Sequence, residues 1–280
     1  MPITDEDVRA VAEFLHDHHD GRVPWMRACA GGSWQVRRPN NGFMLRDGER
    51  VVGALLALYS ERMIDGRAVQ ICNIGTWCVL PAYRSRSMAL LNALLAQEGN
   101  HFTVLSPNPG PQEVLSWMGF SHLDTTAALL PNLPWPSLPG RFDVITEPRV
   151  VERTLVGSQR QIYRDHVCAL AARQLVLAHD GATCHVMYRE FRHAVGTGYA
   201  MILYVSDPLV FRRCLRALTR HLLLRRGLIA TLIEIRILGD RSDVPSWCFR
   251  LRDRRKMYRS DSLAEHQIDY LYSELVTVPW

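Results

Sequence analysis

The chain has 280 residues, of which 48% are hydrophobic and 22% are charged, and its formal net charge at neutral pH is +5. This composition is that of a soluble globular protein, and the length is sufficient for two domains that each bury a core. No stretch approaches the roughly 18 consecutive apolar residues of a membrane-spanning helix, so we expect no membrane partner.

The net charge and the cysteine spacing argue against a nucleic-acid-binding protein and against a disulfide-bonded or metal-binding one. Basic residues gather at 212–226 and 250–259, but a nucleic-acid binder would show a stronger or more one-sided excess, and this bias suits an anionic cofactor equally well. The seven cysteines are scattered and never spaced as Cys-x-x-Cys, so neither disulfides nor a metal site is indicated. An acidic N-terminus without an apolar segment argues against a secretory signal, and we expect a cytoplasmic protein.

The first half of the chain predicts alternating helices and strands. Turns at Asp47-Gly48 and Asp65-Gly66 separate apolar runs, which is typical of hairpins. The expected elements are a helix, three strands, a helix, a strand and a short helix at residues 5–18, 43–46, 51–59, 68–79, 88–97, 101–106 and 112–117.

The run His16-Asp17-His18-His19-Asp20 has the composition of a metal site. Its residues are consecutive, so on a helix they point around the axis and cannot converge on one ion. We expect a solvated helix end.

The most informative segment joins the third strand to the second helix and reads Val79-Leu80-Pro81-Ala82-Tyr83-Arg84-Ser85-Arg86-Ser87-Met88-Ala89. A proline and a tight polar turn lead directly into a helix whose first turn is small and basic. The first N–H groups of a helix lack internal partners and its N-terminus carries partial positive charge, so this turn favours a bound phosphate. Arg84 and Arg86 would add full charges.

The order and spacing of this segment resemble the acyl-CoA signature of the GNAT superfamily of N-acyltransferases, in which Val-x-Pro-x-Tyr-Arg leads into Arg/Gln-x-x-Gly-x-Gly/Ala. Ser87 stands where that family prefers glycine. The resemblance covers residues 40–125 and implies an α/β (α+β) fold, with a mixed, mostly antiparallel sheet flanked by helices. In that family the two neighbouring parallel strands, here 71–79 and 101–106, splay apart, and the pantetheine arm of coenzyme A inserts between them.

The resemblance also implies how acetyl-CoA or another acyl-CoA is held. Backbone N–H groups of residues 84–88 would hold the pyrophosphate, and backbone groups of 77–79 would contact the pantetheine arm. Asn108 matches the family's asparagine, although it fits a turn residue between two prolines equally well. The implied cofactor-binding residues are Trp77, Cys78, Val79, Arg84, Ser85, Arg86, Ser87, Met88, Ala89 and Asn108.

The proton carriers that are usual in that family have no counterpart here. Gly75 and Thr76 occupy the positions where relatives often place an acidic general base, and Leu115 occupies that of a tyrosine acid. Replacements must come from elsewhere in the expected topology. The candidates for catalytic roles are Glu61, Cys72 and Asn73, with Tyr59 near enough to be considered. Cys72 could accept the acyl group or simply pack in the core.

The second half repeats an order of strand, proline, helix, glycine and strand. Pro208 follows Pro81 by 127 positions and Gly227 follows Gly99 by 128, which suggests a duplicated fold, although any α/β domain can produce this order. Bulky residues follow Pro208, so we expect no phosphate site there. The expected elements are strands at 184–192, 199–206 and 228–238 and a helix at 209–226.

Four prolines within residues 131–140 predict a linker. The expected organisation is therefore a GNAT-like acyl-CoA-binding domain at 1–130 and a second GNAT-like domain at 141–280 without the phosphate-binding turn. The second domain would complete the acceptor pocket or form the face of a homodimer.

Two function hypotheses follow. In the first, an acyltransferase moves an acetyl or other acyl group from coenzyme A to an amine or hydroxyl of a small-molecule acceptor. In the second, which the missing proton carriers favour, a catalytically inactive protein of this fold acts as an acyl-CoA sensor or an interaction subunit. Nucleic-acid binding through the basic C-terminal segments is a weaker third hypothesis.

Overall fold

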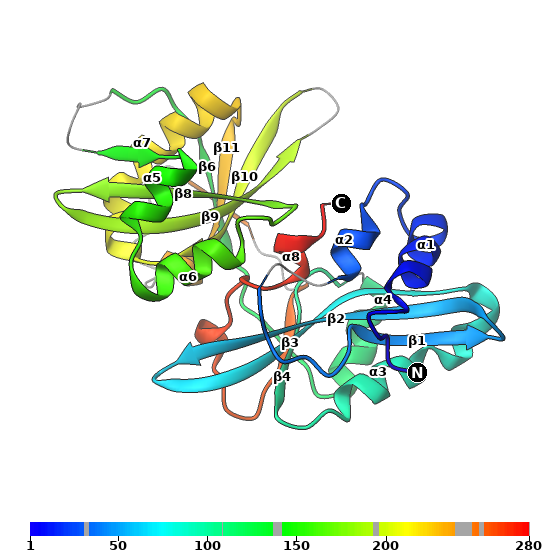
Figure 1. Ribbon diagram of the computed structural model, residues 1–280. Coiled ribbons are helices and arrows are strands. Elements are labelled where there is room, and N and C mark those ends of the chain that lie inside the picture. Colours follow the sequence, from blue (N-terminus) through cyan, green and yellow to red (C-terminus); the bar gives the residue numbers. More distant parts are fainter. Residues whose placement is uncertain are drawn as a thin grey trace. The chain divides into compact units, whose positions relative to one another are not determined.

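The computed structural model describes residues 1–30, 34–107, 109–136, 142–192, 196–238, 248–251 and 255–279. Contacts between residues divide the chain into two compact units (Figure 1). Unit 1 comprises Met1–Leu123, Arg255–Ile268 and Tyr272–Trp280, and unit 2 comprises Asp124–Arg254 and Asp269–Leu271.

Unit 1 is built on a six-stranded sheet with the strand order β1-β2-β3-β4-β13-β5, in which β3 and β4 are parallel and the other pairs are antiparallel. Its strands are β1 (Gly42–Asp47), β2 (Arg50–Ile64), β3 (Arg67–Val79), β4 (Asn100–Val104), β5 (Ser121–His122) and β13 (Met257–Arg259). Its helices are α1 (Val8–His18), α2 (Trp25–Cys29), α3 (Ser87–Leu95), α4 (Pro109–Trp117) and α8 (Glu274–Thr277), with 3-10 turns η1 (Pro81–Arg86) and η4 (Glu265–Gln267).

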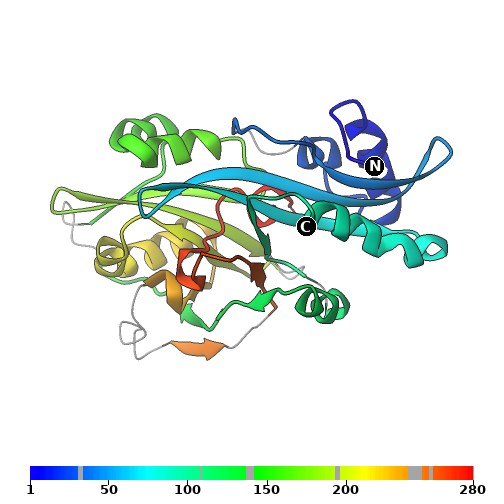
Figure 2. The ribbon, with the colours of Figure 1, turned by 90° about the horizontal axis from the view of Figure 1, so that it is seen from below.

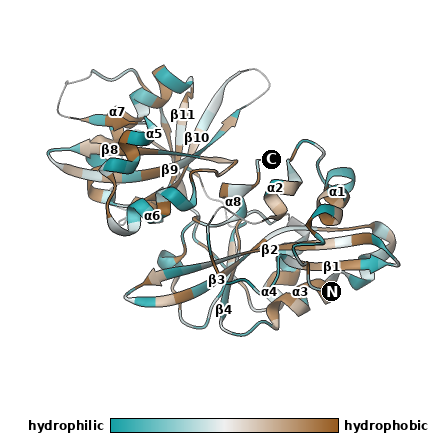
Figure 3. Cartoon of the chain, viewed as in Figure 1, coloured by the Kyte–Doolittle hydropathy of each residue, from teal (hydrophilic) through white to brown (hydrophobic). Residues whose placement is uncertain are grey.

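Both faces of β2 are buried, which explains the apolar run along residues 51–59. Ala54 and Leu56 pack with α1 and α2 on one face, whereas Leu55 and Ala57 pack with α3 on the other. Figure 3 shows hydrophobic and hydrophilic segments alternating in α1, as expected for a helix that buries one face.

Asp65 and Gly66 join β2 to β3 with φ angles of 49° and 76°. Left-handed conformations at both central residues are those of the tight turns that match the twist of a hairpin. The predicted turn is therefore confirmed, and Figure 2 shows the long, twisted hairpin that it closes.

Unit 2 is built on a seven-stranded sheet with the strand order β12-β6-β11-β10-β9-β8-β7. Its strands are β6 (Ala127–Pro131), β7 (Asp143–Ile145), β8 (Ala172–His179), β9 (Ala182–Arg192), β10 (Gly198–Val205), β11 (Ala230–Glu234) and β12 (Phe249–Leu251). Its helices are α5 (Pro148–Thr154), α6 (Gly157–Asp165) and α7 (Pro208–Arg226), with the 3-10 turn η2 (Ile235–Leu238). In the described part of both units, no helix is long and apolar enough to cross a bilayer.

The sheet of unit 2 is also covered on both faces. Leu175 and Leu177 of β8 pack in the cluster formed with α7, whereas Val176 packs with α5 and α6. The side chain of Asp207 accepts hydrogen bonds at the start of α7, and Gly227 ends the helix with a φ of 68°. Both helix boundaries agree with the prediction.

The same topology occurs in both units. In unit 1 the antiparallel strands β1, β2 and β3 are followed by α3 and by β4, which is parallel to β3. In unit 2 the antiparallel strands β8, β9 and β10 are followed by α7 and by β11, which is parallel to β10. A duplication of the fold remains a prediction that this repeated topology motivates.

The units do not follow the predicted domain boundaries. Residues 124–136 belong to unit 2, because β6 pairs with β11, and Pro131 is the last residue of β6. Residues 137–140 of the predicted linker lie outside the described residues. The C-terminal segment instead belongs mainly to unit 1, because β13 pairs with β4 and β5. The strand predicted at 228–238 ends at Glu234, where η2 begins.

Candidate functional site

The parallel strands β3 and β4 separate in the sheet of unit 1. Their paired register ends at Asn73 and Thr103, whereas β3 continues to Val79. The separation predicted for these two strands is thus present. Backbone groups at 74–79 that face this opening can exchange hydrogen bonds with a ligand.

A β-bulge lies where the strands separate. The register between β2 and β3 shifts between Leu55 and Ala57, which leaves Gly75 and Thr76 outside the regular pairing. Thr76 is 6% exposed, and its Oγ1 has no hydrogen-bond partner among the described residues. Because a buried hydroxyl without a partner costs free energy, a ligand that hydrogen-bonds to Thr76 would be favoured here.

Two cavities adjoin at this opening, and both are lined by Trp77 and Pro111. The inner cavity, of about 210 Å³, is lined by His19, Ile74, Gly75, Thr76, Trp77, Val104, Ser106, Pro107, Pro111 and Leu115. The outer cavity, of about 840 Å³, is lined by His18, Trp77, Cys78, Val79, Leu80, Pro81, Arg84, Ser87, Met88, Gly110, Pro111 and Val114. Together they form a path from the bulge to the start of α3.

The turn between β3 and α3 places the positively polarised start of a helix at the outer cavity. Pro81 opens η1, which runs directly into α3 at Ser87, where the N–H of Ser87 donates to the carbonyl of Arg84. The positive end of this helical run lies beside the exposed guanidinium of Arg84. The hydroxyl of Tyr83 donates a hydrogen bond to Asp47 of β1 and ties the turn to the sheet. A helix start beside an arginine favours the binding of an anion in this cavity.

The structure brings part of the predicted cofactor set together. Trp77, Cys78, Val79, Arg84, Ser87 and Met88 line the outer cavity. Ser85, Arg86 and Ala89 are exposed and do not line it, and Asn108 lies outside the described residues.

The three predicted catalytic candidates do not converge on the cavities. Glu61 is exposed and accepts a hydrogen bond of 2.6 Å from Gln70, toward the hairpin turn and away from the bulge. Cys72 is fully buried in the core, and burial raises the pKa of its thiol, which therefore stays protonated. Tyr59 is also buried, and its hydroxyl bonds to Asn40 and Gln97. Packing is the role that the structure gives Cys72 and Tyr59.

Asn73 holds the separation of the strands in place. Its Nδ2 donates to Oγ1 of Thr103 at 3.1 Å, and its Oδ1 accepts from the backbone N–H of Glu274 at 2.9 Å. Asn73 therefore links β3, β4 and the C-terminal segment of unit 1.

Glu274 supplies a carboxyl group that the sequence analysis missed. The residue is fully buried, and its Oε1 accepts hydrogen bonds from the N–H of Leu105 at 3.0 Å and from Oγ of Ser106 at 2.9 Å. Its Oε2 has no partner among the described residues. A Cβ placed on Gly75 would lie 3.9 Å from Cβ of Glu274, so Glu274 stands beside the position where the resemblance implies an acid.

Burial raises the pKa of Glu274, and hydrogen bonds from Ser106 and Asn73 oppose that increase. A carboxylate whose pKa is raised accepts a proton more readily than an ordinary one, which suits it to proton transfer in a reaction. Local sequence patterns could not have identified it, because 201 residues separate Asn73 from Glu274.

The expected solvated helix end is confirmed, because α1 ends at His18 and residues 16–19 are exposed. Two histidines of this end nevertheless line the cavities. His18 lines the outer cavity and His19 the inner one. Burial lowers the pKa of His19, and Asp20 opposes this, so His19 is neutral at neutral pH. Within the described ranges, no three His, Cys, Asp or Glu side chains gather where they could hold a metal ion.

Solved structures of low sequence identity share this arrangement of strands and helices. A GCN5-related N-acetyltransferase from Anabaena variabilis matches with a TM-score of 0.58 and 11% identity, over 92% of this chain and 71% of that one. A conserved protein of unknown function from Enterococcus faecalis matches with a TM-score of 0.63 and 12% identity, over 95% and 73% of the two chains. A GCN5-related N-acetyltransferase from Kribbella flavida matches with a TM-score of 0.56 and 15% identity, over 92% and 69%.

The chain has the GNAT fold. The predicted fold class, a mixed and mostly antiparallel sheet flanked by helices, is therefore confirmed. Neither a protein-family model nor a curated protein matches the sequence. At these identities the likeness establishes the GNAT fold alone, and the function must be argued from the site.

Proposed function

We propose that this GNAT-fold protein is a CoA-dependent acyltransferase that moves an acetyl or other acyl group to an amine or hydroxyl of a small-molecule acceptor. One observation carries the proposal. The path between the separated strands has a positive helix start with Arg84 at one end and Ser106 at the other, and the hydroxyl of Ser106 donates to the buried carboxyl group of Glu274.

The outer cavity suits the nucleotide end of acyl-CoA. The start of α3 and the guanidinium of Arg84 would hold the pyrophosphate, because both present positive charge to the same cavity. Backbone groups of 74–79 would pair with the amides of the pantetheine arm, much as an added strand would. The unpartnered Oγ1 of Thr76 would bond to the same arm inside the inner cavity.

The inner cavity suits the reacting end. The acceptor nitrogen or oxygen attacks the thioester carbonyl, its new bond to carbon forms, and the carbon–sulfur bond breaks to release the CoA thiolate. The proton of the acceptor passes to Oγ of Ser106 as that hydroxyl gives its own proton to Glu274. The thiolate then takes up a proton from water, and Glu274 returns its proton through Ser106 to the hydroxide that is left. The products are the acylated acceptor and CoA, and the carboxylate of Glu274 is regenerated.

One observation favours the second hypothesis, a catalytically inactive acyl-CoA sensor or interaction subunit. Leu115 is 2% exposed and lines the inner cavity at the position where the family often has a tyrosine acid. The alternative function is therefore an acyl-CoA sensor or an interaction subunit that binds the cofactor without turnover.

Calorimetric titration with acetyl-CoA and thiol release with a panel of amine and alcohol acceptors separate these functions. The acyltransferase proposal predicts 1:1 binding, weakened about tenfold in Arg84→Ala, together with acceptor-dependent thiol release. The exposed Arg67 on the hairpin is the matched control, because Arg67→Ala leaves both cavities intact. Binding without release would favour the sensor, and no binding would overturn both.

A further inference from the structure

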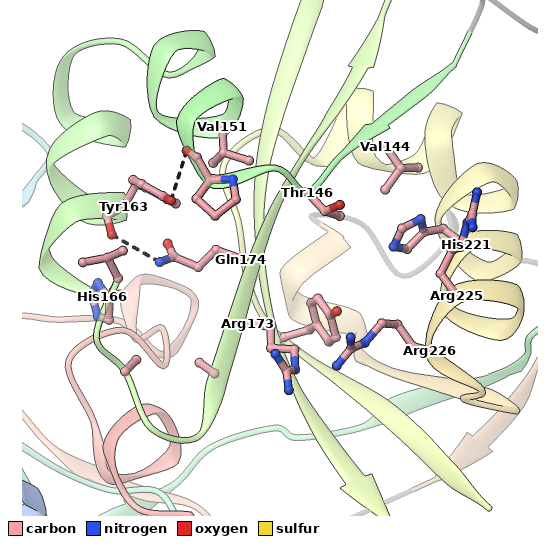
Figure 4. A pocket seen from close by; sticks show the side chains of 15 residues that line it. Val144, Thr146, Val151, Tyr163, His166, Arg173, Gln174, His221, Arg225 and Arg226 are labelled. Carbon is pink, nitrogen blue, oxygen red and sulfur yellow. Dashed lines mark hydrogen bonds between the residues drawn. The ribbon is translucent and has the colours of Figure 1, made fainter.

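Unit 2 carries a second pair of adjoining cavities along α7, far in the sequence from the site proposed above. One has a volume of about 810 Å³ and the other of about 690 Å³, and Val144, His221 and Arg225 line both of them. We call the two together the basic groove. Figure 4 shows the larger cavity, with His221, Arg225 and Arg226 projecting from α7 at one side.

The lining of the basic groove is one-sided in charge. The smaller cavity is lined by five arginines of α7, which are Arg212, Arg213, Arg216, Arg220 and Arg225. The larger cavity adds Arg173 and Arg226. No aspartate or glutamate occurs among the described residues that line either cavity. Such a surface attracts anions strongly.

Glu190 is the acidic partner of two of the arginines that line the larger cavity. Oε1 of Glu190 bonds to Nε of Arg173 at 3.0 Å and to Nε of Arg226 at 2.7 Å, and its Oε2 bonds to Arg192 at 3.0 Å. One carboxylate is therefore shared by three guanidinium groups. The guanidinium of Arg216 lies 4.9 Å from the ring centre of Trp135, which orients it without neutralising it.

The imidazole of His221 is sensitive to this excess of positive charge. Burial lowers the pKa of His221, and the neighbouring Arg225 and Arg226 lower it further. An anion placed beside these arginines would offset their effect and raise the pKa of His221. The histidine is thus an internal probe of occupancy.

The larger cavity has a different character away from α7. Val151, Tyr163 and His166 come from α5 and the end of α6, and Figure 4 shows them on the side opposite the arginines. The hydroxyl of Tyr163 donates to the carbonyl of Pro148 at 3.3 Å, which fixes the ring. Gln174 donates to the carbonyl of Tyr163 at 3.2 Å on the same side. Val151, Tyr163 and His166 are buried, and the apolar surface open to a ligand at this end comes mainly from Val167, which is 56% exposed. Such a surface suits an aromatic or heterocyclic body rather than a further anion.

We infer that the basic groove binds an organic polyphosphate of the nucleoside di- or triphosphate class. Its phosphates would lie along α7 between Arg213 and Arg225, and its ring would lie toward Tyr163. This site is independent of the acyl-CoA proposal, because all its lining residues belong to unit 2 and none belongs to the cavities beside β3.

The test uses the full chain and ATP as the probe. Arg213 and Arg225 are both exposed, so the double variant Arg213→Gln/Arg225→Gln is expected to fold like the parent, with Arg153→Gln as the matched control on α5. We expect saturable 1:1 binding of ATP by calorimetry, weakened at least about tenfold in the double variant and unchanged in the control. We also expect the pKa of His221, followed by NMR of histidine-labelled protein, to rise when ATP is bound.

Three further experiments identify the class of ligand and the cavity in which it binds. Tripolyphosphate is expected to bind more weakly than ATP, and adenosine not measurably, because the groove combines charge with a ring-binding end. Since ATP shares an adenine nucleotide with coenzyme A, ATP binding must survive Arg84→Ala and an excess of acetyl-CoA. Displacement by acetyl-CoA, binding that the double variant retains, or binding of an oligonucleotide but not of ATP would each overturn the inference.

Discussion

Oγ of Ser106 donates a hydrogen bond of 2.9 Å to Oε1 of Glu274, although 168 positions separate the two residues in the sequence. Ser106 lines the inner cavity, whereas Glu274 is fully buried. One hydroxyl therefore connects the cavity to a buried carboxyl group, and the proposed proton transfer can be tested at each of these two residues.

Glu274→Gln should lower kcat about a hundredfold at neutral pH and leave the KM for acetyl-CoA nearly unchanged. The glutamine carbonyl can still accept the hydrogen bonds from Leu105 and Ser106, but an amide cannot take up a proton. Steady-state thiol release over a range of acetyl-CoA concentrations measures both constants.

His19→Gln is the control that separates the two groups able to accept a proton at the inner cavity. We expect this variant to retain the parent's kcat, because the proton is assigned to Ser106 and Glu274. If His19→Gln abolishes turnover while Glu274→Gln does not, the proton acceptor is the imidazole and the assignment is wrong.

The same carboxyl group should make stability depend on pH. Burial raises the pKa of Glu274 above its ordinary value of 4.5, so the folded protein retains a proton that the unfolded chain has already lost. The contribution of this group to the free energy of unfolding is complete below pH 4.5 and decreases as the pH rises toward the raised pKa. Urea unfolding between about pH 4 and about pH 8 should therefore show Glu274→Gln gaining stability relative to the parent. A difference that does not vary with pH would contradict this.

Thr76→Val should weaken acetyl-CoA binding without destabilising the protein. The hydroxyl of Thr76 has no partner among the described residues, so its removal leaves the free energy of unfolding unchanged or increases it by up to about 1 kcal/mol. Calorimetry should show a Kd about tenfold higher.

Thr103→Val is the matched variant for this prediction, because Oγ1 of Thr103 accepts a hydrogen bond from Asn73. It should lose about 1 kcal/mol of stability, since the buried amide of Asn73 loses a partner. Equal stability losses in Thr76→Val and Thr103→Val would argue that Thr76 has a structural partner and is not available to a ligand.

Asp207→Ala should destabilise unit 2 by about 1 kcal/mol. Oδ1 of Asp207 accepts hydrogen bonds from the N–H groups of Leu209 at 2.9 Å and Val210 at 3.0 Å at the start of α7. Asp207→Asn keeps an oxygen in the same place and should recover most of the loss in chemical denaturation. An equal loss in both variants would indicate that the charge, rather than the cap, matters.

Local chemistry made much of the fold predictable. The Asp65-Gly66 turn, the proline at the start of η1 and the glycine after α7 each act within a few residues of their own position, so the hairpin and both long helices of the repeated topology follow from the sequence. The resemblance to the GNAT signature added the separation of β3 and β4, which the paired register bears out.

Long-range pairing was not predictable in the same way. Strand β13 (Met257–Arg259) is too short to be predicted from its own sequence pattern, and it forms because it pairs with β4 and β5. Glu274 lies in the C-terminal segment of the same unit, and its backbone N–H donates a hydrogen bond to Oδ1 of Asn73. The roles expected of Glu61 and Cys72 rested on their nearness to the site in the expected topology of residues 40–125, whereas Glu274, which lies beside Gly75, comes from the far end of the sequence.

Hydrogen–deuterium exchange with and without coenzyme A tests the central claim most directly, because it reports where on the backbone the ligand binds. The account predicts slower exchange on ligand addition at residues 74–79 and 84–88, and loss of this protection in Arg84→Ala. Unchanged exchange in both segments at a concentration where calorimetry detects binding, or protection confined to unit 2, would contradict it.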